Sequence, residues 1–292
     1  MTAEPALAIR DLQKTFPTRR GPFHALEAVN LEIFPGEFVA LMGHSGCGKS
    51  TLLNIIAGLE TQTAGERLLD GKPITGPGPD RMMVFQNYSL LPWMNVYKNV
   101  LLALRSCRKD LDRKAQEAEA DRYIDMVGLS HARTRFPHEL SGGMKQRASI
   151  ARALAVNPRV LLLDEPFGAL DALTREELQE ELLAIWEQNH TTVVMITHDA
   201  DEAILLADRI LMMSNGPAAR IGKEFKVPLQ RPRDRASLLE DPAFYTIRRQ
   251  LIGYLFGDEG HYDDSDDFDN TLFGAEAYLS ESPDRVADFA EA

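Results

Sequence analysis

The segment Gly43–Ser50 leaves this chain few folds to adopt, because it reads Gly-His-Ser-Gly-Cys-Gly-Lys-Ser and fits the pattern G-x-x-x-x-G-K-S in full. Before it stands Phe38–Met42, a continuous apolar run of the kind found in strands that are buried on both faces. After it, Thr51–Gly58 reads as a helix closed by glycine. The sequence therefore predicts a strand, a glycine loop and a helix in that order.

The chemistry of this loop indicates an anion that carries several phosphates. Glycines allow backbone conformations that bulkier residues avoid, consecutive N–H groups can then point at an anion, and the following helix presents its positive N-terminus. Lys49 is expected to reach the terminal phosphates, and the Ser50 hydroxyl to ligate magnesium. A glycine-rich turn without a ligand is the alternative, and the flanking strand and helix disfavour it. The simplest interpretation of Cys47 is a small residue that the loop tolerates. The candidate nucleotide-binding residues of the loop are Gly43, His44, Ser45, Gly46, Cys47, Gly48, Lys49, Ser50 and Thr51.

A second motif supplies carboxylates. Val160–Leu163 is an apolar run that leads directly into Asp164 and Glu165. A carboxylate at the end of a buried strand can hold magnesium opposite a phosphate loop, and this role is predicted for Asp164. Glu165 is predicted to orient or deprotonate an attacking water. Alone, these two acids would read as a turn at a strand end, but beside the glycine loop they predict a nucleotide hydrolase.

Strand-like and helix-like segments alternate along the rest of the chain. Residues 88–157 have apolar positions at helical spacing and predict a helical insertion. Val193–Ile196 is another apolar run, and Leu173–Asn189 before it places its apolar residues on one side of a helix. Alternation of this kind implies an α/β fold with a mostly parallel sheet.

Composition excludes several classes of protein. No uninterrupted apolar run exceeds five residues, far below the roughly 20 that a bilayer-spanning helix needs, and the first residues do not resemble a signal peptide. Two cysteines cannot build a disulfide scaffold or a four-cysteine zinc site. We therefore expect a cytosolic location with reduced thiols.

The net charge of −12 is concentrated near the C-terminus. Residues 258–292 hold twelve acidic residues and one basic residue, so residues 1–257 are nearly neutral and lack the basic face of a nucleic-acid binder. We predict one domain over 1–257, with a helical subdomain at about 88–157, and a disordered acidic tail over 258–292. A docking or autoinhibitory tail is the alternative. The run Asp263–Asn270 lacks the glycine and the terminal glutamate of a calcium-binding loop.

The segment Leu140–Arg147 decides among the nucleotide hydrolases. It reads Leu-Ser-Gly-Gly-Met-Lys-Gln-Arg and, together with the two motifs above, resembles the signature of ABC ATPases. The resemblance covers about residues 7–256 and implies the fold of that family, a P-loop NTPase with a mostly parallel central sheet, an antiparallel β subdomain and a helical insertion. Further family motifs follow: Phe16 resembles the aromatic residue that stacks on adenine, Gln86 the Q-loop glutamine, Asp171 the D-loop aspartate and His198 the switch histidine.

This resemblance implies an ATPase with ATP and Mg²⁺ as cofactors. Ser141, Gly142 and Gly143 would contact the nucleotide held by a second ATPase subunit, while Glu165 would orient the water and His198 would contact the γ-phosphate. A core position for Phe16 and a surface position for His198 are the alternatives. The other residues expected at the nucleotide are Phe16, Gln86 and Asp171, and the expected metal ligands are Ser50, Gln86 and Asp164.

Several segments resemble one group of importers within the family. Asn87–Val96, which contains Leu-Pro-Trp, is similar to the nitrate, sulfonate and taurine importer ATPases, and segments 76–81, 215–219 and 231–235 look most like the nitrate/nitrite subunits and their bicarbonate and cyanate relatives. The resemblance implies uptake of a small inorganic anion, with nitrate or nitrite as first choice and bicarbonate, cyanate or a sulfonate such as taurine as alternatives. For 87–96, core packing stays open. For 231–235, a solvated basic turn is favoured over contact with lipid headgroups.

The partners of such a subunit would be membrane-spanning permease subunits and a second ATPase subunit, in a homo- or heterodimer, at the cytoplasmic face of the inner membrane. An extracytoplasmic solute-binding protein would be an indirect partner, and no nucleic acid is expected. A soluble, non-transport ABC ATPase would need long coiled coils or a second cassette. A nucleotide-regulated interaction protein would be expected to lack Glu165 or His198, and a small-molecule kinase would have no use for Leu140–Arg147.

Overall fold

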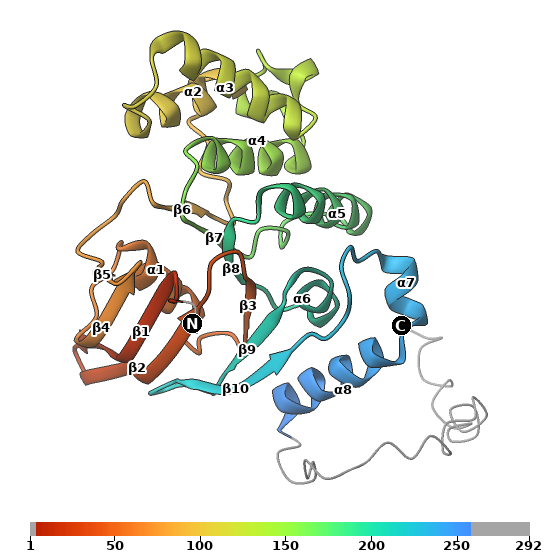
Figure 1. Cartoon of the computed structure of the whole chain (residues 1–292). Coiled ribbons are helices and arrows are strands. Elements are labelled where there is room, and N and C mark those ends of the chain that lie inside the picture. The colour runs from red at the N-terminus through yellow and green to blue at the C-terminus, as the bar shows by residue number, and fades with distance from the viewer. Residues whose placement is uncertain (1–3, 258–292) are drawn as a thin grey trace, which may run out of the picture.

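Two β-sheets with helices around them form the structure (Figure 1). The computed structural model describes residues 4–257, so the tail predicted over 258–292 lies outside the described residues. Within 4–257, no helix combines the length and apolarity that crossing a membrane requires. The strands are β1 Leu7–Thr18, β2 Gly21–Ile33, β3 Phe38–Met42, β4 Ala64–Leu69, β5 Lys72–Pro73, β6 Arg81–Val84, β7 Val160–Asp164, β8 Thr192–Ile196, β9 Arg209–Met213 and β10 Ile221–Lys226. The α-helices are α1 Lys49–Ala57, α2 Val96–Cys107, α3 Arg113–Met126, α4 Gly142–Ala155, α5 Ala172–Asn189, α6 Ala200–Leu206, α7 Arg235–Glu240 and α8 Pro242–Phe256.

The larger sheet has the strand order β10-β9-β3-β8-β7-β6 and is parallel except for β10, which pairs antiparallel with β9. Its central strand, β3, is buried on both faces. Val39 and Leu41 belong to one hydrophobic cluster, while Phe38, Ala40 and Met42 belong to the other. The continuous apolar run is therefore explained by two covered faces, and the predicted fold class is confirmed.

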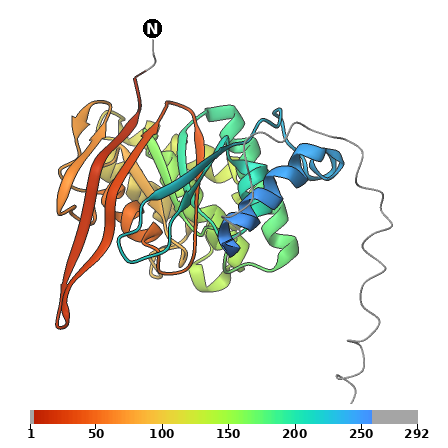
Figure 2. The same ribbon diagram turned by 90° about the horizontal axis from the view of Figure 1, so that it is seen from below.

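One face of this sheet is covered by α1 and by the smaller, antiparallel sheet, whose order is β2-β1-β4-β5. β1 and β2 form a long hairpin, whose two strands run side by side in Figure 2. Leu52 and Ile56 of α1 share a hydrophobic cluster with Leu7 of β1 and Leu41 of β3, so α1 lies between the two sheets. Gly58 ends α1 with a φ of 79°, as the sequence predicts.

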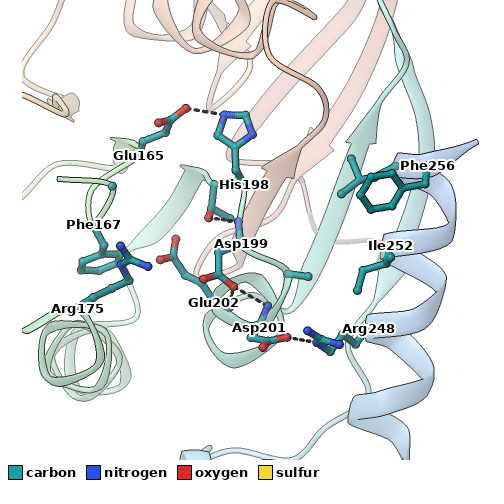
Figure 3. A pocket seen from close by; sticks show the side chains of 14 residues that line it. Glu165, Phe167, Arg175, His198, Asp199, Asp201, Glu202, Arg248, Ile252 and Phe256 are labelled. Carbon is teal, nitrogen blue, oxygen red and sulfur yellow. Dashed lines mark hydrogen bonds and ion pairs between the residues drawn. The ribbon is translucent and has the colours of Figure 1, made fainter. Parts of the chain in front are cut away.

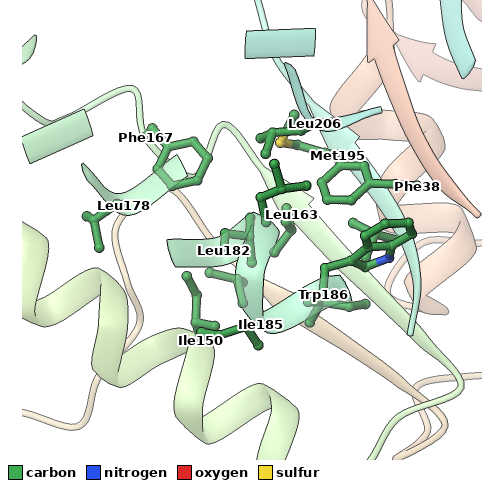
Figure 4. Packing of buried hydrophobic residues seen from close by; sticks show 14 of the residues in the cluster. Phe38, Ile150, Leu163, Phe167, Leu178, Leu182, Ile185, Trp186, Met195 and Leu206 are labelled. Carbon is green, nitrogen blue, oxygen red and sulfur yellow. The ribbon is translucent and has the colours of Figure 1, made fainter. Parts of the chain in front are cut away.

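The opposite face is covered by α5 and α6. The ring of Trp186 meets the ring of Phe38 edge-on, with centroids 5.8 Å apart and an interplanar angle of 70°. Leu182 of α5 joins Leu163 of β7 and Met195 of β8 in the same cluster (Figure 4). This packing buries the apolar side that the sequence predicts for residues 173–189.

Helices α2, α3 and α4 gather at one end of the molecule, beyond β6 and β7 (Figure 1). Asn95 and Asp112 cap α2 and α3 with their side-chain oxygens. The helices begin at Val96 and not at residue 88, because residues 85–95 form an irregular loop after β6. Trp93 in this loop is 69% exposed, so for this residue the core-packing interpretation is wrong.

The basic segment 231–235 differs from the solvated turn that the sequence favours. The guanidinium of Arg231 lies 4.1 Å from the ring centroid of Trp186 and forms an ion pair with Asp208 at 2.8 Å. Arg233 is buried, with 6% of its surface exposed. Its guanidinium donates to the backbone carbonyls of Ile204, Leu205, Ala207, Val227 and Leu229. This segment therefore ties the C-terminal elements to the end of α6.

Candidate functional site

The glycine loop connects β3 to α1 at the carboxyl edge of the parallel sheet. Gly43 has a φ of 150°, and a Cβ there would lie 2.9 Å from the Cys47 Sγ atom. Gly46 and Gly48 have φ values of 80° and 97°, and Gly48 caps α1. Backbone conformation thus requires glycine at these positions, and the first N–H groups of α1 open onto the loop, as an anion site needs.

The ammonium group of Lys49 lies inside this loop. Its Nζ atom donates to the carbonyl oxygens of Gly43 at 2.7 Å and His44 at 2.9 Å, and the side chain is buried. Burial lowers the pKa of Lys49, while the nearby Cys47 and the carboxylate of Glu165 oppose that shift. A cation held in this way can contact an anion that enters the loop.

Asp164 at the end of β7 meets the first turn of α1. The Ser50 hydroxyl donates to its Oδ1 atom at 3.3 Å. Burial, followed by the charge of Glu165, raises the pKa of Asp164, and Ser50, Lys49 and His198 oppose this. A hydroxyl and a carboxylate oxygen side by side are the donors that Mg²⁺ accepts together with substrate phosphates, so the residues present fit this ion.

Glu165 contacts two other predicted site residues, His198 and Gln86. Its Oε1 atom lies 2.7 Å from His198 Nε2 (Figure 3), and its Oε2 atom accepts from Gln86 Nε2 at 3.3 Å. The backbone of Glu165 has a φ of 46° and donates its N–H to Ile196 at the end of β8. Three strand ends, those of β6, β7 and β8, therefore bring Gln86, Glu165 and His198 together.

The signature residues lie elsewhere in the chain's fold. Ser141 caps α4 and accepts from the Met144 N–H at 3.3 Å. A Cβ on Gly142 would lie 3.1 Å from Leu170, and one on Gly143 would lie 2.6 Å from Thr174, so α4 approaches α5 closely here. Figure 1 shows α4 well apart from α1 and its loop. The N-terminus of α4, with Ser141 as its cap, is therefore separate from the phosphate loop of the same chain.

Two further predicted residues have local partners. Asp171 caps α5 by accepting from the Thr174 N–H at 3.1 Å, which lowers its pKa. Phe16 on β1 is half-buried and outside both hydrophobic clusters, so the core interpretation of Phe16 is wrong. The Lys14 ammonium lies 4.5 Å from the Phe16 ring centroid, on a side chain that also pairs with Glu60. Of the remaining loop residues, Ser45 is exposed and Thr51 is half-buried in α1.

A cleft of about 480 Å³ extends from Glu165 and His198 toward α8 (Figure 3). Its far wall is formed by Ile252, Leu255 and Phe256, and the His44 Nε2 atom contacts the Leu255 carbonyl at 2.5 Å. The sequence gives no signal for this contact, because 211 residues separate the two partners. The phosphate loop thus touches the last turn of the described chain.

The fold and the site together define a P-loop nucleoside triphosphatase. Comparison with known proteins then gives the family. The profile described as "ABC transporter" matches residues 26–168. The chain is 55% identical over 251 residues to the nitrate import ATP-binding protein NrtD of Synechococcus elongatus, covering 86% of this chain and 92% of that protein. It is 52% identical to the bicarbonate transport ATP-binding protein CmpD of Synechocystis sp., covering 88% of this chain and 91% of that protein.

Solved structures show the same similarity. The ATP-binding cassette MJ0796, solved as a dimer bound to ADP and Pi, superposes with a TM-score of 0.68 at 34% identity, covering 77% of this chain and all of that one. The protein cbiO1 from Clostridium perfringens superposes with a TM-score of 0.67 at 27% identity, covering 87% of this chain and 99% of that one. The chain belongs to the ATP-binding proteins of the ABC transporter family and is an ATPase, which confirms the resemblance seen in the motifs.

Proposed function

We propose that this chain is the ATP-hydrolysing subunit of an importer for a small inorganic anion, with nitrate or nitrite as the transported solute. The observation that carries the solute is the 55% identity to the nitrate import protein NrtD, which extends over 92% of that protein. The resemblance of segments 76–81 and 215–219 to nitrate/nitrite subunits supports the same choice.

Bicarbonate is the second candidate solute. The identity of 52% to the bicarbonate transport protein CmpD extends over 91% of that protein and is close to the value for NrtD. Cyanate and sulfonates such as taurine are weaker alternatives that rest on motif resemblance alone. The residues of the site bind nucleotide in every one of these cases, so uptake measurements are needed to separate them.

Nucleotide binding is assigned to the phosphate loop and its surroundings. In this proposal the N–H groups of residues 43–51 and the Lys49 ammonium bind the β- and γ-phosphates, while Phe16 stacks on adenine. Ser50, Asp164 and Gln86 would hold Mg²⁺, which would neutralise charge at the phosphates when bound. The 3.3 Å contact between Ser50 and Asp164 supports a shared ion at this point.

Hydrolysis is assigned to Glu165 and His198. Glu165 accepts a proton from water as the water oxygen forms a bond to the γ-phosphorus, and the bond from that phosphorus to the bridging oxygen of ADP breaks. His198 donates a hydrogen bond to the γ-phosphate and, at 2.7 Å, holds the Glu165 carboxylate in place. Gln86 contacts the other oxygen of Glu165 and orients it from β6.

The complete site requires a second ATPase subunit. We propose that Ser141, Gly142 and Gly143 at the start of α4, together with Asp171 at the start of α5, act on the nucleotide of that subunit, because the start of α4 is separate from the chain's own loop. Trp93, exposed before α2, is proposed to contact a membrane-spanning permease subunit. The pair would lie at the cytoplasmic face of the inner membrane and would receive solute through an extracytoplasmic binding protein.

Residues 4–257 contain every site residue named above, so we propose one ATPase domain over 1–257, with residues 88–157 as its helical subdomain. The tail 258–292 is proposed to be dispensable for hydrolysis. A chain ending at Gly257 should therefore keep the ATPase rate of the full chain. A loss of most of that rate would show that the tail belongs to the catalytic unit.

The function is tested by solute uptake in cells that lack this gene. Labelled nitrate uptake should fall, should return with the intact gene, and should stay low with Lys49→Ala, because that variant cannot bind ATP productively. Bicarbonate, cyanate and taurine uptake are measured in the same strains. Unchanged nitrate uptake with loss of bicarbonate uptake would reject nitrate and support the second candidate.

A further inference from the structure

Glu202 is a buried carboxylate for which the proposed reaction has no use. It belongs to α6, which follows His198 in the chain, and 5% of its surface is exposed. The next five residues, 203–207, are all apolar and buried. An apolar residue at position 202 would fit this helix at lower cost, since a carboxylate loses its hydration on burial. A specific role would explain its presence.

The hydrogen bonds of Glu202 lead directly to the switch segment Thr197–Asp199. The Thr197 side chain lies close enough to the Glu202 carboxylate to lower its pKa. The Asp199 N–H donates to Thr197 Oγ1 at 3.0 Å, and Asp199 Oδ1 accepts from the Glu202 N–H at 3.1 Å. Both neighbours of His198 in the chain are therefore fixed by Glu202 or by the first turn of its helix.

A second set of contacts holds the Glu202 carboxylate from the other side. Gln179 of α5 is 1% exposed, and its Nε2 atom donates to Glu202 Oε2 at 2.6 Å. The Oε1 atom of Gln179 accepts from the Arg235 guanidinium on α7. Arg235 also lies 3.8 Å from Glu180. The carboxylate is thus connected directly to α5 and, through Gln179, to α7.

Among residues 4–257, Glu202 forms no direct ion pair. Burial raises the pKa of Glu202 to about 7, with the charge of Asp199 adding to this and Thr197, Gln179 and the charge of Arg175 opposing it. Figure 3 shows Glu202 on the side of α6 away from Asp201 and Arg248, which pair with each other at 2.6 Å. Glu202 is therefore held by hydrogen bonds whose geometry is specific.

We propose that Glu202 is a positioning residue for His198: its carboxylate, held by Gln179, which Arg235 contacts in turn, anchors Thr197 and so places the His198 imidazole within hydrogen-bonding distance of Glu165. This inference rests on the role of His198 in the proposed function. It assigns the sequence Thr197–Asp199 a fixed conformation that depends on α5 and α7 as well as on β8.

Steady-state ATP hydrolysis by the full chain tests the proposal with three variants. Glu202→Ala and Thr197→Val should lower kcat on the order of 10-fold to 100-fold, because displacement of a catalytic group by about 1 Å has effects of that size. The KM for ATP should stay within about twofold, since no contact to the phosphate loop is removed. Glu202→Gln, which keeps one acceptor oxygen of the same reach, should recover most of the rate.

A matched control separates positioning from stability. Gln116 of α3 is also buried and donates to two backbone carbonyls, of Arg108 and Leu111, but lies in the helical part of the fold. Gln116→Ala should lower the melting temperature without lowering kcat. If Glu202→Ala and Gln116→Ala change kcat and melting temperature in the same proportion, Glu202 has a structural role and the proposal is rejected.

A comparison with His198→Ala distinguishes this inference from the proposed function. If His198→Ala keeps the normal rate, the assigned role of His198 fails, and the inference fails with it. If His198→Ala is slow while Glu202→Ala is normal, the assigned role stands and the inference alone is rejected. If both are slow, the double variant should be no slower than His198→Ala, because the two changes remove one interaction.

Histidine-labelled NMR gives a readout that is independent of turnover. The His198 ring signal, assigned by its loss in His198→Ala, should shift or broaden in Glu202→Ala and return toward its original position in Glu202→Gln. An unchanged His198 signal in Glu202→Ala would overturn the proposal whatever the rates show.

Discussion

Replacement of the Glu165 side chain should abolish most ATP hydrolysis while leaving ATP binding in place. Glutamine has the same shape and can keep contacts to His198 and Gln86, but it cannot accept a proton from water. We expect Glu165→Gln to bind ATP with an affinity close to that of the intact chain and to hydrolyse it about 10²-fold to 10⁴-fold more slowly. Single-turnover hydrolysis and equilibrium nucleotide binding measure the two steps, and a normal rate would remove the base role from Glu165.

Glu202 should make the stability of the fold depend on pH. Because burial raises its pKa from 4.5 to about 7, the folded chain holds a proton that the unfolded chain releases between these values, and stability falls as pH rises through that window. As the pH rises from about 5.5 to about 8, the unfolding free energy of Glu202→Gln should therefore increase by about 2 kcal/mol relative to that of the intact chain. Urea unfolding at several pH values measures this, and a pH-independent difference would contradict it.

The side chains that the sequence predicts best are those in contiguous motifs at strand ends. Lys49, Ser50, Asp164 and Glu165 each follow a recognisable apolar run, and the structure brings them to one edge of the sheet. Glu202 could not be predicted in this way. Its partner Gln179 is 23 residues earlier, and Arg235 is 56 residues beyond Gln179, so their contact arises only when α5, α6 and α7 pack.

The stability of helix α6 should depend on Arg233 more than on any surface arginine. The guanidinium of Arg233 satisfies carbonyl groups at the end of α6 and on the segment before α7. Arg233→Met would leave these buried acceptors unpaired, and we expect a loss of about 2 to 5 kcal/mol of unfolding free energy. Chemical denaturation measures this loss.

The matched control for Arg233 is Arg113 on α3, which forms an exposed ion pair with Glu117 at 3.0 Å. Arg113→Met should change the unfolding free energy by less than about 0.5 kcal/mol, as removal of an exposed ion pair usually does. Equal losses in the two variants would mean that the carbonyl contacts of Arg233 do not stabilise α6.

Among the strands and helices, those whose apolar residues follow one clear pattern along the sequence are predictable. Strands β3, β7 and β8 appear as apolar runs because both faces of the sheet are covered, and α5 appears as a helix with one apolar side. The hairpin of β1 and β2 gives a weaker pattern, because its pairing is interrupted by register shifts between Ile9 and Thr15. The segment 231–235 differs from the sequence prediction because arginine usually stays hydrated, whereas here the Arg233 guanidinium is buried and donates to carbonyl groups at the end of a helix.

Within residues 4–257, the phosphate loop and the signature segment lie apart. The phosphate loop lies at one end of α1, between the two sheets, whereas the signature residues lie at the start of α4, beyond β6 and β7. If both must contact one nucleotide, the signature has to come from another copy of the chain. A pair related by a two-fold axis would then form two sites, each with the loop of one copy and the signature of the other.

Mixing two inactive variants tests this arrangement. Lys49→Ala disables the loop, and Ser141→Arg blocks the signature, so either variant alone should form pairs with no complete site. In mixed pairs one of the two sites combines an intact loop with an intact signature, while the other contains both changes. An equal mixture should therefore regain about a quarter of the wild-type ATPase rate, if copies pair at random as two-fold dimers and the sites act independently. Activity should appear only on mixing and should rise with protein concentration, because it depends on association. If instead the signature served its own loop, no pairing of these two variants would contain a complete site, and the mixture would stay as inactive as its components.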